Sequence, residues 1–349
     1  MFDKIRLMVF PRSVLVGHEV LKSLPNLLDD LSLSGKPLIV TGNKTWNVAG
    51  EKVSKMLESR QPELIKVTKC TTAELNSVIE KVESSDIGVI LGIGGGSKID
   101  LAKLTAAKKK LPFVSIPTSA SHDGIVSSRA SIKDGMTSVS HEAVAPTGIV
   151  ADTSVIAKAP PKLLASGCAD VIGNLVAVAD WRLALSLKNA PFSSSAAALS
   201  EMAAGLILDN VSQIKKMDEN AAWITLKSLI ASGVSMCIAG SSRPASGSEH
   251  KFSHALELIA PGKALHGEAC GIGAIMMAFA HQLDWKRIKK SLTEIGAPTS
   301  AKELGIEDGD VVEALIRATE IRPERFTIID NGITREAAER IARVTGVTE

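Results

Sequence analysis

Aromatic side chains are scarce in this sequence: tyrosine is absent, and phenylalanine, tryptophan and tyrosine together account for 3% of 349 residues. Proteins that stack nucleic-acid bases, or that sit in the interface of a bilayer, use aromatic side chains at the contact surface. The net charge is only +2, so the overall electrostatic field attracts neither nucleic acid nor an anionic membrane. We therefore expect no nucleic-acid partner, and any anion has to be bound by a local cluster of charges.

Cysteine is also rare, and no long hydrophobic run is present. The longest apolar run, around residues 272–280, is much shorter than a helix that crosses a bilayer. The first ten residues are too few and too charged for a secretory signal. These absences predict a cytoplasmic protein without integral membrane contact. Without any CxxC pair, the four cysteines are expected to be free buried thiols: Cys70, Cys168, Cys237 and Cys270.

What the sequence does contain is a regular alternation of strand and helix patterns over its first 120 residues. Strand patterns lie at residues 13–17, 37–42, 64–68, 87–93 and 113–119, with helical patterns between them. This spacing predicts a doubly wound, mostly parallel α/β sheet with helices on both faces. Residues 120–158 have short β patterns, which we interpret as a loop and a hairpin, and the later segments are almost all helical. We predict an α/β domain over residues 1–158 and an all-α domain over residues 159–349.

A glycine turn connects the fourth predicted strand to a helical pattern. The strand runs directly into Gly94, Gly95, Gly96 and Ser97. Glycines let backbone N–H groups approach a diphosphate closely, and the N-terminus of the next helix adds the positive end of its dipole. A second polar turn, at residues 118–121, ends the neighbouring strand, so both turns can face one ligand. The pattern favours dinucleotide binding, and a tight turn without a ligand is the alternative.

Three of the seven histidines lie within residues 241–271. His250 and His254 are four residues apart, so they share one face of a helix. His266 follows a Pro-Gly loop and begins an apolar segment that is typical of a buried helix. Imidazoles from two helices that meet across a turn can form half of a metal site. Surface or capping histidines are the alternative, and the missing ligands of a metal must come from elsewhere in the chain.

Five motifs together resemble the metal-dependent polyol dehydrogenase superfamily, which includes glycerol dehydrogenases, iron-containing alcohol dehydrogenases and dehydroquinate synthase. They are GGGSKID, PTSASHDGIVSSRASI, GCADVIGN, SSRPASGSEHKFSHAL and ALHGEACGIG. The resemblance covers nearly the whole chain. Within the superfamily the motifs are most similar to those of the archaeal sn-glycerol-1-phosphate dehydrogenase family. The resemblance implies a dehydroquinate synthase-like fold, in which the α/β domain binds the dinucleotide and the helical domain binds metal and substrate.

The resemblance also implies roles for individual residues. Asp170, His250 and His266 would bind the metal, while Asp123 and His254, together with Asp170, would contact substrate as catalytic residues. Three ligands and an open position are typical of a catalytic zinc site. Iron-type relatives carry a further histidine where this chain has an asparagine, so we favour one Zn²⁺ per subunit. The residues that would line NAD(H) or NADP(H) are Gly94, Gly95, Gly96, Ser97, Lys98, Ile99, Asp100, Thr118, Ser119, Ala120, Ser121, Ser127 and Asn43.

The implied reaction is the reduction of dihydroxyacetone phosphate to sn-glycerol 1-phosphate, for ether phospholipid biosynthesis, by a homo-oligomer. Arg243, Lys251 and Lys263 are candidates for binding the phosphate, with solvated surface charges as the alternative. Three other functions stay open: a glycerol dehydrogenase that uses an unphosphorylated polyol, a dehydroquinate synthase-like lyase, and a regulator that binds without turnover. The stretch HDGIVSSRASI lacks the Lys-Thr-Gly of the lyase motif, which disfavours the lyase.

The loop after the second predicted strand predicts which nicotinamide is used. Strict NAD enzymes place a carboxylate at the end of an early strand, where it binds the ribose 2′-hydroxyl and repels a 2′-phosphate. Here Gly42 is followed by Asn43 and Lys44, and no acidic residue occurs before Glu51. We therefore expect the wild type to use both NADH and NADPH.

Asn43→Asp should raise KM for NADPH about tenfold or more, because a like charge beside the 2′-phosphate costs at least about 1 kcal/mol. The KM for NADH should change little. Measuring KM for both cofactors in the wild type and the variant checks this. A wild type that cannot use NADPH, or a variant that loses both cofactors equally, would mean that this loop does not contact the ribose.

Overall fold

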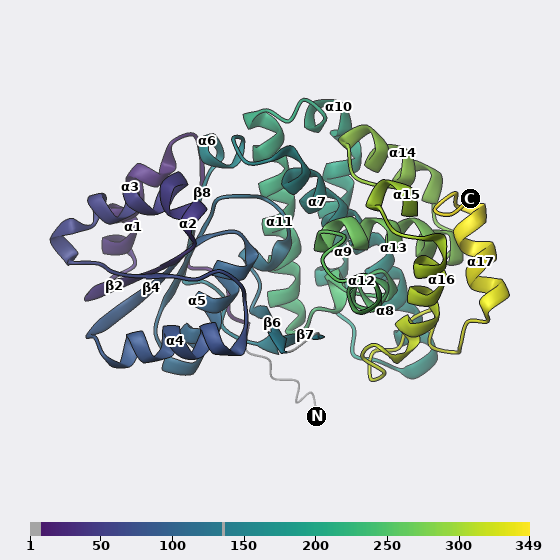
Figure 1. Ribbon diagram of the computed structural model, residues 1–349, viewed down its shortest axis with the longest axis horizontal. Helices are drawn as coiled ribbons and strands as arrows, with labels where there is room; N and C mark the ends of the chain where they lie inside the picture. The colour runs from purple at the N-terminus through teal and green to yellow at the C-terminus, as the bar shows by residue number, and fades with distance from the viewer. Residues whose placement is uncertain (1–7, 135–136) are drawn as a thin grey trace.

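A six-stranded sheet fills the N-terminal half of the computed structural model, which describes residues 8–134 and 137–349 (Figure 1). Across the sheet the order is β1-β8-β5-β4-β2-β3, and each neighbouring pair is parallel. The predicted doubly wound α/β architecture is thereby confirmed. The strands are β1 (Ser13–Gly17), β2 (Lys36–Thr41), β3 (Glu63–Lys66), β4 (Ile87–Gly94), β5 (Phe113–Pro117) and β8 (Gly148–Asp152).

Both faces of the sheet are covered by helices, which explains why the strands have continuous apolar sequences. On β4, Val89, Leu91 and Ile93 face one helical layer, and Ile90 faces the other; all four are fully buried. Each such side chain contributes roughly 1.5–3 kcal/mol on leaving water. The covering helices are α1 (Leu24–Asp30) and α3 (Glu51–Met56) on one face, and α4 (Thr72–Glu83) and α5 (Gly96–Lys109) on the other.

The strand β8 corrects one prediction. Its short pattern was assigned to the loop and hairpin region, whereas the structure inserts it between β1 and β5 in the main sheet. The hairpin itself is β6 (Arg129–Asp134) paired with β7 (Thr137–Glu142). Gly135 lies outside the described residues, as do residues 1–7 of the stretch considered for a signal. Because β1 and β8 are far apart in the chain, no local pattern could indicate that they pair.

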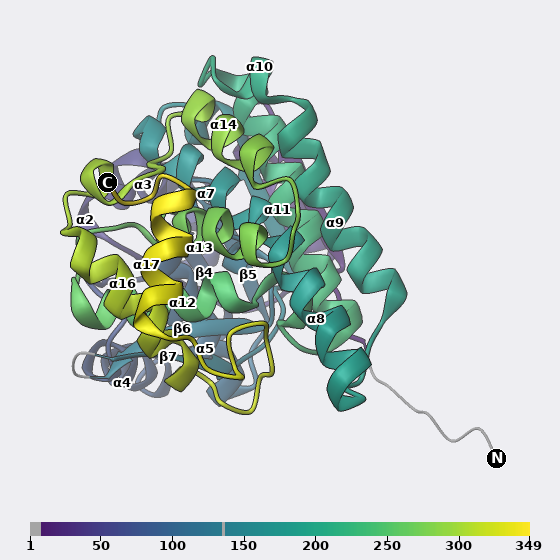
Figure 2. The same ribbon diagram turned by 90° about the vertical axis from the view of Figure 1, so that its right-hand side faces the viewer.

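After Asp152 the described elements are all helical. The apolar helix α13 lies at the centre of this half and packs against α7, α12 and α14 (Figure 2). The sheet ends at Asp152, and the domain boundary at 158/159 stays a prediction. The longer helices of this half are α7 (Pro161–Ile172), α8 (Asn174–Lys188), α9 (Ser194–Asp209), α11 (Glu219–Ala239), α12 (Ser248–Ile259), α13 (His266–Ala280), α14 (Trp285–Ile295), α16 (Asp308–Arg317) and α17 (Arg335–Val344). Single turns in this half are α6 (Thr153–Ile156), α10 (Val211–Ile214) and α15 (Ala301–Leu304), and α2 (Asn43–Thr45) is a single turn in the sheet half.

Two helical stretches of this half, Pro161–Lys188 and Glu219–Ala239, are long and apolar enough to cross a membrane. In their most apolar windows, 83% and 61% of the residues are buried inside the protein. Their hydrophobicity is therefore accounted for by packing in the helical core.

The direction of the chain across the sheet reverses between β2 and β4. From β2 the chain continues outward to β3, whereas from β4 it proceeds the other way through β5 to β8. Ligands of open parallel sheets bind outside the carboxyl ends of the strands at such a reversal. Asn43 follows β2, residues 94–97 follow β4, and residues 118–121 follow the neighbouring β5. The fold therefore places the predicted cofactor-binding turns at the edge where a dinucleotide is expected.

The segment at residues 120–127 is in close contact with the helical half. A Cβ at Gly167, in α7, would come within 2.0 Å of the Ala120 carbonyl oxygen. A Cβ at Gly233, in α11, would come within 2.4 Å of the Val126 Cβ. Both distances are far below van der Waals contact, so only glycine permits the helices to approach this closely.

Gly167→Ala should destabilise the protein by about 2–3 kcal/mol, because the added methyl group forces α7 away from the Ala120 carbonyl. Gly205→Ala is the matched control, since Gly205 is also inside a helix but has no atom within 4 Å of its Cβ position. That control should be neutral or gain about 0.5–1 kcal/mol in helix propensity. Urea denaturation of both variants measures the difference, and equal effects would contradict the close approach.

Candidate active site and metal centre

A cavity of about 660 Å³ lies between the end of the sheet and the helical half. This volume is within the range of small-molecule binding sites. The cavity brings residues of the predicted cofactor site and of the predicted metal and substrate site into one space. Its lining includes Gly96, Ser97, Asp100, Ser121 and Ser127 from the first set, and Asp123, His250, His254 and His266 from the second.

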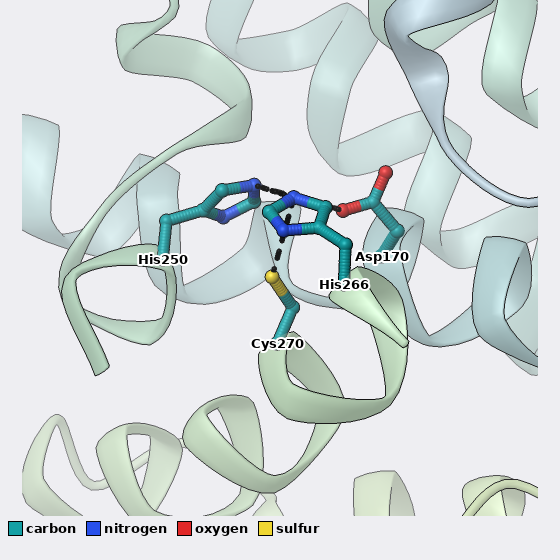
Figure 3. A group of neighbouring side chains, drawn as sticks. All are labelled: Asp170, His250, His266 and Cys270. Carbon is teal, nitrogen blue, oxygen red and sulfur yellow. Dashed lines mark hydrogen bonds and ion pairs between the residues drawn. The ribbon is translucent and has the colours of Figure 1, made fainter. Parts of the chain in front are cut away.

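The three predicted metal ligands converge at the helical side of this cavity (Figure 3). Asp170 comes from α7, His250 from α12, and His266 is the first residue of α13. Asp170 Oδ1 lies 3.6 Å from Nε2 of both histidines, and the two Nε2 atoms are 3.2 Å apart. Atoms that bind one tetrahedral metal at 2.0–2.1 Å are about 3.3–3.4 Å from each other. The three atoms therefore have the spacing of three corners of a tetrahedral zinc site.

The Asp170 carboxylate supports a cation at this point. Its side chain is 2% exposed, and Oδ1 has no hydrogen-bond partner in the described part of the chain. The other oxygen, Oδ2, accepts a hydrogen bond from the N–H of Asp123 at 3.1 Å. Burial raises the pKa of Asp170 to about 7. An unpartnered buried carboxylate oxygen is unfavourable, and a cation between Asp170 and the two histidines would supply the missing partner.

Glu249 holds the ring of His250 from behind. His250 Nδ1 lies 2.8 Å from Glu249 Oε1, which also accepts a hydrogen bond from the N–H of Gly247 at 2.7 Å. With Nδ1 as the donor, the lone pair of Nε2 is directed toward Asp170 and His266. Burial raises the pKa of Glu249 to about 8 and lowers the pKa of His250 well below its ordinary value. The histidine is therefore neutral, which is the form that binds metal.

Cys270 is a fourth side chain beside the three predicted ligands. Its Sγ lies 3.7 Å from His266 Nε2, and the potential ligand atoms of Asp170, His250, His266 and Cys270 all lie within 4.8 Å of one another. Burial raises the pKa of the Cys270 thiol well above its ordinary value, so it is protonated in the absence of metal. Cys270 is a free buried thiol, as are the other three cysteines, which confirms that prediction. The sequence prediction did not place it beside the metal ligands, although its spacing of four residues from His266 puts both on one helix face.

Asp123 and His254, the predicted substrate contacts, lie beside the metal ligands. Asp123 Oδ2 accepts a hydrogen bond from Ser232 Oγ at 2.7 Å, and burial and then the charge of Asp170 raise the pKa of Asp123 to about 7. The centroid of the His254 ring is 6.5 Å from that of His250 and 6.0 Å from that of His266. Burial lowers the pKa of His254 to about 3. At neutral pH the His254 side chain is therefore a neutral imidazole.

The glycine turn is packed against a histidine that the sequence prediction did not select. A Cβ at Gly96 would lie 2.1 Å from His122 Nε2, so only glycine at this position leaves room for the ring. His122 Nδ1 in turn accepts a hydrogen bond from the N–H of Gly124 at 3.0 Å. Its place next to Asp123, in the motif SHDG, was the available signal. His122 therefore links the dinucleotide turn to the substrate segment.

Only some of the predicted cofactor residues line the cavity. Asp100 lines the cavity. Its Oδ2 accepts a hydrogen bond from the N–H of Ser131 at 3.0 Å, and this bond attaches the hairpin to α5. Lys98 Nζ donates to the carbonyl oxygen of Thr68 at 2.7 Å. Their assignment to the cofactor stays a prediction. The predicted cofactor residues outside the cavity lining are Gly94, Gly95, Lys98, Ile99, Thr118, Ser119, Ala120 and Asn43.

Comparisons with known proteins agree with this geometry. The family profile of iron-containing alcohol dehydrogenases matches residues 15–160. A glycerol-1-phosphate dehydrogenase (NAD(P)+) of Methanosarcina acetivorans is 51% identical over 342 residues, which cover 97% of this chain and 96% of that protein. The Methanothermobacter thermautotrophicus protein of the same name is 49% identical over 340 residues, 97% of each chain. Among solved structures, Schizosaccharomyces pombe glycerol dehydrogenase has a TM-score of 0.80 at 19% identity, with 98% of this chain and 91% of that chain covered; this likeness shows the fold.

His266→Ala should lose bound zinc and nearly all turnover while the protein stays folded, because it removes one of three converging ligands. Zinc content by atomic absorption at neutral pH, with circular dichroism for the fold, measures this. Cys270→Ser is the control and should keep stoichiometric zinc if the thiol is not a ligand. Stoichiometric zinc in the His266 variant would show that the ligand assignment is wrong.

Proposed function

This chain belongs to the glycerol-1-phosphate dehydrogenase family, and from that premise we propose that it reduces dihydroxyacetone phosphate to sn-glycerol 1-phosphate. The proposed cofactors are NADH or NADPH and one zinc ion per subunit. The proposal rests on one observation: His250 and His266, whose ring nitrogens converge with the Asp170 carboxylate, line the same cavity as Gly96 and Ser97. A ketone bound beside the candidate metal ligands would lie next to a nicotinamide bound at the glycine turn, so the two reactants would be held close together.

The setting of the enzyme is part of the proposal. We propose a cytoplasmic homo-oligomer that supplies sn-glycerol 1-phosphate for ether phospholipids. We also propose that residues 1–158 carry the dinucleotide and residues 159–349 carry the metal and much of the substrate site. The relatives' names support the substrate and the nicotinamide.

Asp170, His250 and His266 would hold the metal. When bound, zinc supplies a Lewis acid for the negative charge that develops on a ketone oxygen during reduction. Glu249 contributes by accepting the hydrogen bond of His250 Nδ1, which keeps the Nε2 lone pair on the ligand side. Because all three histidines of this region have lowered pKa values, chiefly through burial, the imidazoles of His250, His254 and His266 are neutral at physiological pH.

The overall reaction adds a hydride to C2 of the ketone and a proton to its oxygen. Asp123 can hold a proton at neutral pH, since burial and the neighbouring Asp170 raise its pKa to about 7. The neutral His254 can donate or accept a hydrogen bond without adding charge to the cavity. We propose that these two residues orient the substrate, and that the proton reaches the oxygen through His254 or water.

The enzyme should prefer dihydroxyacetone phosphate to dihydroxyacetone by about 100-fold or more in kcat/KM, because the unphosphorylated ketone leaves a cationic phosphate site unpaired. The measurement is NAD(P)H oxidation with each ketone in the presence of zinc, followed by the chirality of the product. A product other than sn-glycerol 1-phosphate contradicts the proposal. Equal rates with both ketones would favour a glycerol dehydrogenase, and cofactor binding without turnover would favour a regulator.

A further inference from the structure

The three residues that the sequence offered as phosphate ligands do not line the cavity. Arg243 donates a hydrogen bond to the carbonyl oxygen of Phe326 at 2.8 Å. Lys251 is 1% exposed and forms an ion pair with Asp330 at 2.5 Å. Lys263 is exposed to solvent. Instead of facing a substrate, Arg243 and Lys251 anchor the segment at residues 321–330, which follows the short helix η6 (Ala318–Glu320).

That segment carries Arg322 into the cavity lining, together with His250, His254 and His266. The Arg322 guanidinium forms neither a hydrogen bond nor an ion pair with any residue that the structure describes, although the charge of Glu324 raises its pKa slightly against the larger effect of burial. Its charge lies close enough to lower the pKa of all three histidines, after the larger effect of burial in each. Arg322 is therefore a cation beside the candidate metal site with no partner of its own within the described chain.

The backbone at Arg322 is held in an unusual conformation. Its φ of 48° is in the left-handed region, where a residue other than glycine is disfavoured by about 1–3 kcal/mol and persists only if its surroundings impose it. Here the surroundings do so. Arg325 donates to the Ser246 carbonyl oxygen at 2.5 Å and to Ser242 Oγ at 2.8 Å, and the N–H of Ile328 donates to Asp180 Oδ1 at 2.8 Å. These contacts hold the segment that follows Arg322, and the N–H of Ile321 donates to the Ala318 carbonyl oxygen at 3.2 Å on the preceding side. The backbone at Arg322 is therefore held in place.

A second arginine, Arg129, enters the same cavity lining from the start of the hairpin. Its position is fixed by Lys103, which is 0% exposed and donates to the carbonyl oxygens of Arg129 at 2.7 Å and Gly124 at 2.5 Å. Burial lowers the pKa of Arg322, and the positive charge of Arg129 lowers it further. Arg129 and Arg322 thus bring two guanidinium groups to the lining of one cavity.

We propose that Arg322 binds the phosphate group of the substrate, with Arg129 as a second contact from the hairpin. The inference rests on the proposed function and identifies the residue that gives it specificity for a phosphorylated ketone. The planar guanidinium offers paired N–H donors that match phosphate oxygens. Because Arg322 lies near the three histidines, a phosphate on it would place the rest of a small ketone beside the candidate metal ligands.

The test compares Arg322→Asn and Arg322→Lys with the control Arg317→Ala. Asparagine tolerates the left-handed conformation, so the first variant removes the charge without adding backbone strain. Arg317 is exposed and forms a surface ion pair with Glu313, so its loss should leave catalysis unchanged. For each protein we would measure kcat/KM for dihydroxyacetone phosphate and for dihydroxyacetone, KM for NADH and NADPH, competitive inhibition by inorganic phosphate, and the melting temperature.

Arg322→Asn should lower kcat/KM for dihydroxyacetone phosphate about 100-fold or more, because a charge-assisted contact to phosphate is lost. Values for dihydroxyacetone and for both cofactors should stay within about twofold, and inorganic phosphate should inhibit more weakly. Arg322→Lys should recover part of the loss, since it keeps the charge but not the paired donors.

Several results would overturn the inference. A parallel loss with both ketones would indicate a general effect on catalysis or fold, and a raised KM for the nicotinamide would assign the arginine to a cofactor phosphate. If the wild type prefers the phosphorylated ketone and Arg322→Asn keeps that preference, only the inference about Arg322 fails. If the wild type shows no preference for the phosphorylated ketone, the proposed function itself fails.

Discussion

The burial of one carboxylate, Asp170, is the constraint on which the site depends. Three acidic groups lie in this small region, and burial is the largest cause of a raised pKa in each: about 7 for Asp170 and Asp123, and about 8 for Glu249. Burial likewise lowers the pKa of His250 and His266. Burial thus disfavours the charged form of both kinds of group, the carboxylates and the imidazolium ions. Such a site can lower its free energy by binding a cation and releasing protons.

A further buried carboxylate, Asp180, fixes the geometry around this site. Its Oδ2 accepts a hydrogen bond from the N–H of Ser248 at 2.6 Å, at the start of the helix that carries His250. Its Oδ1 accepts from the N–H of Ile328 and lies 2.8 Å from Nε2 of His281. One side chain from α8 therefore aligns the histidine helix, the end of α13 and the segment that presents Arg322. Because Asp180 contacts the elements that carry the candidate metal ligands and the proposed phosphate ligand, the fold sets the spacing between these residues.

Much of this could be predicted from sequence, because the signals were local or carried by motifs. The strand at residues 13–17 has the same bounds in prediction and structure. The relatives confirm the family resemblance that the motifs indicated. The histidine pair was visible from its spacing, but spacing alone could not connect it to Asp170, eighty residues earlier in the chain.

Other features were beyond prediction because they depend on contacts between distant segments. The strand β8 inserts between β1 and β5, and only the assembled sheet selects that position. Arg322 lies outside every recognised motif, and its lack of a partner within the described residues becomes apparent only once the surrounding chain is in place. Conversely, Lys251 has the charge that a phosphate ligand needs and is close in sequence to the histidines, yet in the structure it is paired with Asp330. Charge can be read from a sequence, but the partner of a charge cannot.

The segment at residues 120–129 belongs to both halves of the molecule. From the sheet half, the buried Lys103 donates to two of its carbonyl oxygens. From the helical half, Ser232 donates to the Asp123 side chain and Asp170 accepts from the Asp123 backbone. Separating the halves would leave these buried polar groups unpaired at the same moment. The change from sheet to helices after Asp152 is therefore a change of architecture rather than of cooperativity: calorimetry should record one unfolding transition, and limited proteolysis should release neither half as a stable fragment.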